Sequence, residues 1–146
     1  MSEALLAIPC PACGTLNRVP EERLADRPHC GRCKARLLPA EPVALDDASF
    51  ARVAERGDLP VVVDFWAAWC GPCHAMAPAF ATAAAALSPR VRFAKVDIDR
   101  APATADRFGI RSVPALVRLE RGRETGRLMG ARPAGQIQAF ATGALA

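Results

Sequence analysis

Residues 61–73 read VVVDFWAAWCGPC, and this stretch decides the fold. Its first six residues, Val61 to Trp66, are mostly β-branched and aromatic, which is typical of a strand covered on both faces. Pro60 precedes the strand, and Gly71-Pro72 between two cysteines marks a turn at the start of a helix. The stretch therefore predicts a central strand that runs into a helix through a Cys-x-x-Cys turn.

The two cysteines of this turn form a predicted redox pair. At a helix N-terminus, unpaired amides and the positive end of the helix dipole favour the thiolate of Cys70. Cys70 is therefore expected to attack a substrate disulfide, and Cys73, one turn inside the helix, to resolve the mixed disulfide. Metal binding is the alternative for this pair, but His74 is the one further ligand nearby, so the redox interpretation is preferred.

Helices and strands alternate on both sides of the pair, and a strand–helix–strand order predicts parallel strands with a right-handed crossover. A proline at position 78 is expected to kink the helix that follows Cys73. The predicted elements are a helix from Asp46 or Asp47 towards Arg56, the helix through Leu87, a strand over 91–96, a short helix over 102–108, a hairpin of 115–120 and 124–129, and a last helix from Pro133 to the C-terminus.

Four further cysteines lie near the N-terminus as two Cys-x-x-Cys pairs, separated by sixteen residues. This spacing is typical of a tetrahedral zinc site with four thiolates. Gly14 and Gly31 are expected to let the backbone point amides at the sulfurs, and basic residues nearby to offset the charge of the thiolates. Two disulfides or a rubredoxin-like iron site remain alternatives. The predicted ligands are Cys10, Cys13, Cys30 and Cys33, and the predicted charge partners are Arg18, Arg32, Lys34 and Arg36.

The length of 146 residues suffices for one ordinary domain and a small appendage. Residues 1–40 contain few large apolar side chains and would need a metal to hold them, which predicts a zinc ribbon at 1–40 and a second domain at 41–146. The net charge of +4 comes from 19 basic and 15 acidic residues that are spread along the chain. This distribution gives little support to nucleic-acid binding.

The first residues lack the positive charge and the long apolar run of a secretory signal, so a cytoplasmic location is expected. Residues 65–89 contain no charged side chain and are long enough to span a bilayer. They also contain Gly71, Pro72 and Pro78, so a strand, a turn and a helix explain them better than a membrane span. No long apolar stripe is left unassigned, which predicts a monomer.

The stretch 62–73 resembles the active-site segment of thioredoxins, and the resemblance continues at 95–97, 108–114, Gly122 and Gly130. The four upstream cysteines resemble the zinc module of the two-domain thioredoxins. The resemblance covers nearly the whole chain. It implies an α/β protein with the thioredoxin fold, a central mixed β-sheet flanked by helices, preceded by a small four-cysteine zinc ribbon.

The resemblance also implies roles for two charged residues of the sheet. Asp64 lies on a strand that should be buried, where desolvation would raise its pKa and let it exchange a proton with Cys73. Lys95, on the neighbouring strand, would pair with Asp64 and adjust that pKa. A hydrogen-bonded core carboxylate and a surface lysine are the respective alternatives.

A substrate-binding rim is implied around the cysteine pair. Pro114 matches the cis-proline of the family, and Val113 before it would offer backbone groups to an extended substrate segment. The residues that the resemblance assigns to this rim are Trp69, Gly71, Pro72, Val113, Pro114 and Gly130. His74, Ser112 and Ala115 depart from the usual lysine or arginine, glycine and threonine, and His74 weakens the local positive field above the histidine pKa.

The activity that the resemblance implies is protein-disulfide reduction. Its partners would be disulfide-containing client proteins and a thioredoxin reductase that uses NADPH and flavin, with no organic cofactor on this chain. Oxidation of the four N-terminal thiolates would expel zinc, so this site is expected to be redox-sensitive. The alternative is a binding or sensing module in which the ribbon recruits a partner. Residues 1–40 contain no aromatic side chain, so nucleic acid is not expected as that partner. A membrane partner is not expected either.

Overall fold

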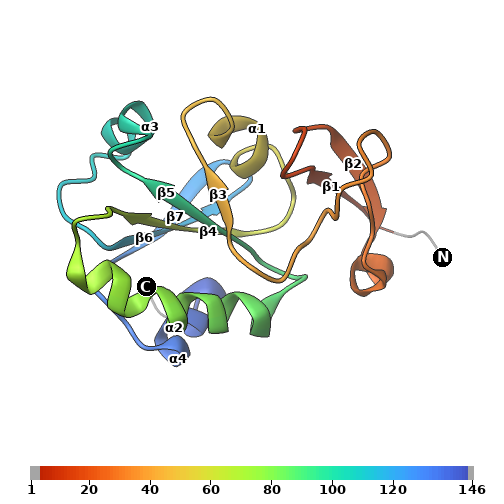
Figure 1. The fold of residues 1–146 in the computed structure, drawn as a ribbon. Helices are drawn as coiled ribbons and strands as arrows, with labels where there is room; N and C mark the ends of the chain where they lie inside the picture. The colour runs from red at the N-terminus through yellow and green to blue at the C-terminus, as the bar shows by residue number, and fades with distance from the viewer. Residues whose placement is uncertain (1–3, 145–146) are drawn as a thin grey trace.

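The computed structural model describes residues 4–144, which form two β-sheets (Figure 1). The first sheet pairs β1 with β2, and the second has the strand order β3-β5-β4-β6-β7. The strands are β1 (Leu5–Pro9), β2 (Leu16–Pro20), β3 (Val43–Leu45), β4 (Val61–Trp66), β5 (Arg92–Asp97), β6 (Ala115–Glu120) and β7 (Arg123–Met129). The helices are α1 (Phe50–Ala54), α2 (Gly71–Leu87), α3 (Pro102–Arg107) and α4 (Ala134–Ala141), and η1 (Glu21–Asp26) is a short 3-10 helix.

The strand β4 lies at the centre of the five-stranded sheet, as the sequence predicts. It pairs in parallel with β5, where Asp64 lies opposite Lys95. It pairs antiparallel with β6, where Asp64 lies opposite Leu116. The expected fold class is confirmed, because a central mixed sheet flanked by helices follows a small unit with four clustered cysteines.

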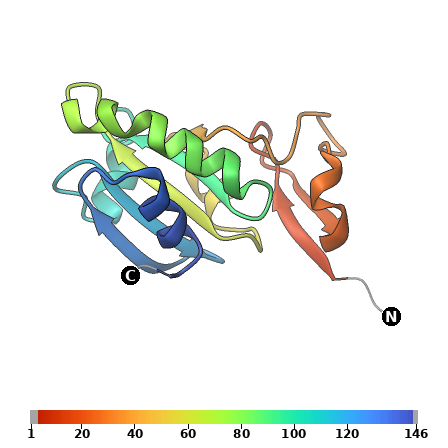
Figure 2. The same cartoon turned by 90° about the horizontal axis from the view of Figure 1, so that it is seen from below.

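Helices cover both faces of this sheet, with α2 and α4 on one face and α1 and α3 on the other (Figures 1 and 2). Successive side chains of a strand point to opposite faces. In β4, Val63 and Phe65 accordingly lie in the core beside α1, and Val62 lies in the core beside α2 and α4. Asp64 therefore shares the α2 face with Val62, and this places its carboxyl group beneath the helix that carries the cysteine pair.

The predicted strand, turn and helix over residues 65–89 are present as the end of β4, a loop and α2, which contains Pro78. Within residues 4–144, no helix combines the length and apolarity needed to cross a lipid bilayer. The predicted hairpin is present as β6 and β7. The prediction that the last helix continues to the C-terminus is wrong: α4 ends at Ala141, and Gly143 then has a φ of +86°, a conformation that stops helices.

One of the two residues predicted to cap α1 is confirmed. The Asp46 side chain accepts a hydrogen bond from the Ser49 amide in the turn that leads into the helix, and the Asp46 carbonyl oxygen accepts one from the amide of Phe50, where the helix begins. Asp47 accepts hydrogen bonds from the amides of Ala103 and Thr104, so it caps α3. The three-residue strand β3, which pairs in parallel with β5, has no counterpart in the predicted elements.

The four-cysteine unit packs against the end of the large sheet that is remote from the start of α2 (Figures 1 and 2). The amide of Asp58, just before β4, donates a hydrogen bond of 2.9 Å to the carbonyl oxygen of Ala7 in β1. The amide of Ala7 donates in return to the carboxylate of Asp58 at 2.7 Å. Leu59 joins the small apolar core of this unit, which also holds Ile8 and Leu37. The two units are thus joined by paired hydrogen bonds and a shared core.

Candidate active site and zinc site

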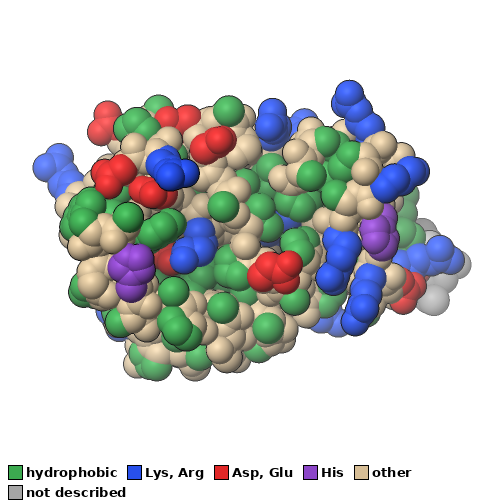
Figure 3. All heavy atoms as spheres, in the orientation of Figure 1, with side chains coloured by type: hydrophobic (Ala, Val, Ile, Leu, Met, Phe, Trp, Pro, Cys, Tyr) green, Lys and Arg blue, Asp and Glu red, His purple; other side chains and the backbone are tan. Residues whose placement is uncertain are grey.

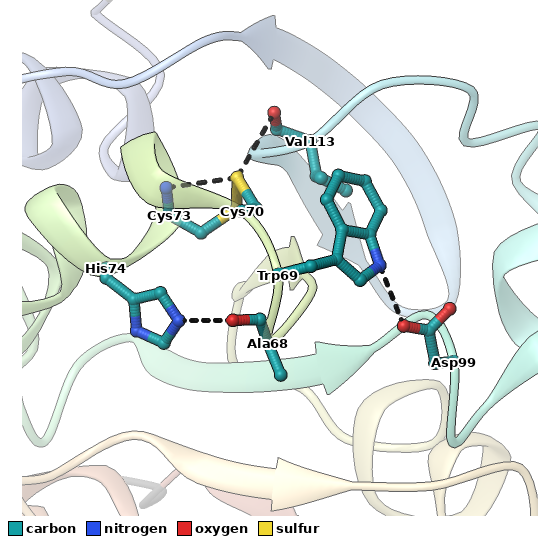
Figure 4. The surroundings of a disulfide bond; sticks show 7 residues. All are labelled: Ala68, Trp69, Cys70, Cys73, His74, Asp99 and Val113. Carbon is teal, nitrogen blue, oxygen red and sulfur yellow. Dashed lines mark hydrogen bonds between the residues drawn. A yellow bond between two sulfur atoms is a disulfide. The ribbon is translucent and has the colours of Figure 1, made fainter.

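Cys70 and Cys73 lie at the start of α2 and are joined by a disulfide, with their Cα atoms 5.3 Å apart (Figure 4). Cys70 is the N-cap residue, and its sulfur accepts a hydrogen bond of 3.1 Å from the amide of Cys73. Pro72 occupies the first turn, where its missing N–H costs nothing. Both cysteines are buried to nearly the same extent, so the helix amide rather than exposure distinguishes the Cys70 sulfur.

The loop before β6 faces this disulfide. The carbonyl oxygen of Val113 lies 3.7 Å from the sulfur of Cys70 (Figure 4), and the Val113–Pro114 peptide bond is cis. The amide of Gly130 donates a hydrogen bond of 2.9 Å to the carbonyl oxygen of Pro114. The structure thus brings together Cys70 and three residues of the predicted rim, although they come from distant parts of the sequence.

Trp69, the residue before Cys70, has 69% of its surface exposed. Its indole nitrogen donates a hydrogen bond of 2.9 Å to the carboxylate of Asp99 (Figure 4). Gly71 and Pro72 are exposed beside it, and a Cβ added at Gly71 would meet no atom within 4 Å. The rim therefore combines an exposed aromatic ring with an open helix start. Sequence reasoning missed Asp99, for which no local pattern exists.

Asp64 is fully buried, and neither carboxylate oxygen has a hydrogen-bond partner among the described residues. Burial raises its pKa to about 7, against the opposing effect of the positive charge of Lys95. The expected direct ion pair is not formed, since no salt bridge within 4.0 Å joins these two residues. The ammonium nitrogen of Lys95 lies instead 4.8 Å from the centre of the Trp66 ring, a cation–π contact.

His74 bridges the helix and the loop before it. Its Nε2 atom lies 2.7 Å from the carbonyl oxygen of Ala68 (Figure 4), so this nitrogen carries the donated proton. Its ring packs edge-on against Trp66, with 6.1 Å between the ring centres. The histidine that departs from the family pattern thus has a defined position, in which it holds the backbone two residues before Cys70.

The four N-terminal cysteines converge, and all their sulfur atoms lie within 4.8 Å of one another. The separations are 3.5 Å between Cys10 and Cys33, and 3.7 Å between Cys13 and Cys30. Four sulfurs at about 2.3 Å from one zinc ion stand about 3.8 Å apart. The sulfur positions therefore fit a tetrahedral zinc site with no place left for a further ligand.

Backbone amides point at two of these sulfurs. Those of Ala12 and Cys13 lie 3.4 Å from the sulfur of Cys10, and those of Arg32 and Cys33 lie 3.3 and 3.5 Å from the sulfur of Cys30. The amide of Cys33, with the other donors, lowers the pKa of Cys30 to about 6. Such donors favour the thiolate form that metals bind.

The expectation for the glycines of this site holds at one of the two turns. Gly14 has a φ of +78°, whereas the left-handed residue of the second turn is Lys34, with a φ of 68°. Gly31 instead donates its amide to the side chain of Asn17. In each turn, the residue with left-handed backbone conformation directly follows the second cysteine of the pair. The positions of the glycines in the sequence did not predict this.

Dithiol–disulfide exchange is the chemistry that the paired cysteines at the start of α2 support, and by class the chain is a thiol–disulfide oxidoreductase.

Comparison with known proteins agrees with this class. The family model described as thioredoxin matches residues 41–143, and the model described as thioredoxin 2, N-terminal, a zinc ribbon, matches residues 9–35. Thioredoxin C-3 of Corynebacterium nephridii is 46% identical over 126 residues, which cover 86% of each chain. The thioredoxin of Alicyclobacillus acidocaldarius is 45% identical over 97 residues, 66% of this chain and 91% of that one. The chain belongs to the thioredoxin family.

Proposed function

We propose that this chain is a protein-disulfide reductase in which Cys70 attacks and Cys73 resolves. The observation that carries the proposal is the Cys73 amide 3.1 Å from the Cys70 sulfur, because this donor stabilises a thiolate at Cys70. The Cys70 thiolate attacks one sulfur of a client disulfide, and the other client sulfur leaves as a thiolate. Cys73 then attacks Cys70, which releases the second client thiolate and forms the Cys70–Cys73 disulfide.

Asp64 is proposed as the group that takes the proton of Cys73 when this thiol becomes a nucleophile. The support is its burial on the α2 face of β4, its unpartnered oxygens and its pKa of about 7. A base with a pKa near the working pH can accept and return a proton readily. Lys95 is proposed to adjust this pKa through its charge.

Client proteins are proposed to bind along the rim formed by the Val113 loop and Trp69. The position of the Val113 backbone next to Cys70 supports pairing with an extended client segment, a short form of β-augmentation. The exposed Trp69 ring supports apolar contact with the client. The residues assigned to client binding are Trp69, Gly71, Pro72, Val113, Pro114 and Gly130.

The four N-terminal cysteines are proposed to hold one zinc ion, and no organic cofactor is assigned to the chain. Zinc in a closed four-thiolate site supplies structural cross-linking rather than catalysis. The proposed domains are the ribbon at 1–40 and the thioredoxin domain at 41–146. The proposed electron donor is a thioredoxin reductase that uses NADPH and flavin. The protein is proposed to be a monomer and to act in the cytoplasm.

Reduction of insulin disulfides with NADPH and a thioredoxin reductase tests this mechanism. The unchanged protein should turn over, and Cys70→Ser should lose all activity. Cys73→Ser should instead accumulate a mixed disulfide with the client, because the resolving thiol is missing. A mixed disulfide that accumulates on Cys70→Ser and not on Cys73→Ser would reverse the two roles. Absence of turnover in the folded, unchanged protein would refute the reductase proposal.

A further inference from the structure

Arg92 is a buried cation that the proposed redox chemistry does not use. It begins β5 in the large sheet, and only 5% of its surface is exposed. Its Nη2 atom donates a hydrogen bond of 2.7 Å to the carbonyl oxygen of Pro9, the residue before Cys10. Its Nη1 atom is buried and has no hydrogen-bond partner among residues 4–144. The guanidinium group therefore extends from the thioredoxin domain to the ribbon, where only one of its two terminal nitrogens has a hydrogen-bond partner among the described residues.

The group that Arg92 reaches is the backbone beside Cys10 and not a carboxylate. Within residues 4–144, no carboxylate lies within 4.0 Å of Arg92, since the three salt bridges join other residues. Burial lowers the pKa of Arg92 to about 10, and a negative charge on the Cys10 sulfur would oppose this effect. A buried charge without a counter-charge is strongly destabilising. The position of Arg92 is thus explained if the sulfur cluster carries negative charge.

A zinc ion held by four thiolates has a net charge of about −2. We propose that Arg92 is the counter-charge of the zinc site, supplied by the thioredoxin domain from outside the ligand set, and that it also positions the Pro9–Cys10 backbone. This inference rests on the proposed four-cysteine zinc site. Groups that support metal ligands from outside the ligand set commonly change metal affinity by about 10- to 100-fold, and Arg92 binds the backbone one residue before Cys10.

The basic residues of the ribbon itself are poorly suited to this task. Figure 3 shows Lys and Arg side chains gathered on the surface at the ribbon end of the molecule, and Arg18, Arg32, Lys34 and Arg36 are all exposed. Water and salt screen exposed charges strongly and buried ones much less. The expected charge partners thus lie in solvent, and Arg92, which the sequence did not indicate, lies in the interior.

The alternative explanation is that Arg92 only donates a hydrogen bond to the ribbon and that its charge is unimportant. Substitutions at position 92 can distinguish these two roles. Arg92→Gln keeps an N–H donor and removes the charge, whereas Arg92→Lys keeps the charge. Arg90→Gln is the matched control, because Arg90 is exposed and lies two positions earlier. The measurement is the rate at which the reduced, zinc-loaded protein releases zinc to excess chelator, followed with a metallochromic dye.

Zinc release should be about 10- to 100-fold faster in Arg92→Gln, less accelerated in Arg92→Lys and unchanged in Arg90→Gln. Zinc release at the wild-type rate in Arg92→Gln would overturn the inference and leave the zinc site intact. If the unchanged protein bound no zinc, the zinc site and the inference would both fail.

A second measurement needs no variant and decides the question if Arg92→Gln does not fold. Removal of zinc from the unchanged, reduced protein should leave Arg92 buried without a counter-charge. Amide hydrogen exchange should then accelerate at residues 92–94 of β5 more than at 115–119 of β6, because local opening reports local stability. Equal protection of 92–94 with and without zinc would overturn the inference.

Discussion

Asp64 and Lys95 lie directly opposite each other in the register of β4 and β5, yet the Lys95 ammonium group stacks on Trp66 and leaves the Asp64 carboxyl without a direct partner. An ion pair would stabilise the carboxylate and lower its pKa. Without that pair, burial dominates and the pKa rises to about 7. Because the Lys95 ammonium group lies on Trp66 and not on the carboxylate, its charge does not cancel the effect of burial on the pKa of Asp64.

The first prediction concerns stability of the oxidised protein. In the unfolded chain Asp64 ionises near its usual pKa of 3.8, whereas in the folded protein it keeps its proton up to about pH 7. The unfolded state therefore binds fewer protons between these values, and the contribution of Asp64 to stability falls as the pH rises from about 4 to about 7. Asp64→Asn should remove this dependence and should be more stable than the unchanged protein at pH 8, by at most about 4 kcal/mol.

Urea unfolding at pH 5 and pH 8 measures this effect. The difference between Asp64→Asn and the unchanged protein should grow from pH 5 to pH 8. Asp97→Asn is a suitable control, because Asp97 is only partly buried and lies at the end of β5. A stability difference that stays constant over this pH range would show that Asp64 is already ionised in the folded protein.

The second prediction concerns the resolving step. Asp64→Asn cannot accept the proton of Cys73, so the mixed disulfide should decay about 100-fold more slowly at pH 7, a typical loss on removal of a general base. Rapid-quench measurement of mixed-disulfide decay isolates this step. The defect should shrink as the pH rises, because solvent hydroxide can then take the proton in place of Asp64. An equal defect at pH 7 and pH 9.5 would indicate a structural effect of the substitution.

The third prediction concerns the hydrogen bond between Trp69 and Asp99. Asp99→Ala should free the indole ring and raise KM for protein clients several-fold with little change in kcat, because a mobile ring binds at a higher entropic cost. Asp99→Asn keeps an oxygen acceptor and should behave more like the unchanged protein. Trp69 fluorescence gives an independent measure of the ring environment, best recorded in a Trp66→Phe background. Identical KM values for both Asp99 variants would show that the hydrogen bond does not prepare the rim.

Local sequence signals predicted the centre of the fold because they are strong there. The apolar run of β4 and the Cys-Gly-Pro-Cys turn fix a strand and a helix start without help from distant residues. Asp47 was misassigned because its partners at the start of α3 lie 56 and 57 residues away. Arg92 was missed for the same reason, since the Pro9 carbonyl that it binds is 83 residues distant. The three-residue strand β3 is too short for its pattern to differ from that of a loop.

The fourth prediction concerns the turn at Gly14, where the ribbon meets α1. Its φ of +78° disfavours any residue with a Cβ, and a Cβ there would also lie 2.6 Å from Cδ of Arg52. Its carbonyl oxygen further accepts a hydrogen bond from the side chain of Arg56. Gly14→Ala should therefore strain the first cysteine turn and disturb the contact between the two units, and both effects should weaken zinc binding.

Gly109→Ala is the matched control for this substitution. Gly109 also has a positive φ, of +63°, but a Cβ there would meet no atom within 4 Å. Gly109→Ala should cost only the backbone penalty of about 1–2 kcal/mol and leave zinc release unchanged. Gly14→Ala should lower the Tm of thermal unfolding more than Gly109→Ala does, and it should release zinc to a chelator faster. Equal decreases in Tm and equal rates of zinc release in the two variants would mean that only the backbone conformation matters at Gly14. The packing of Arg52 against the ribbon would then not stabilise the zinc site.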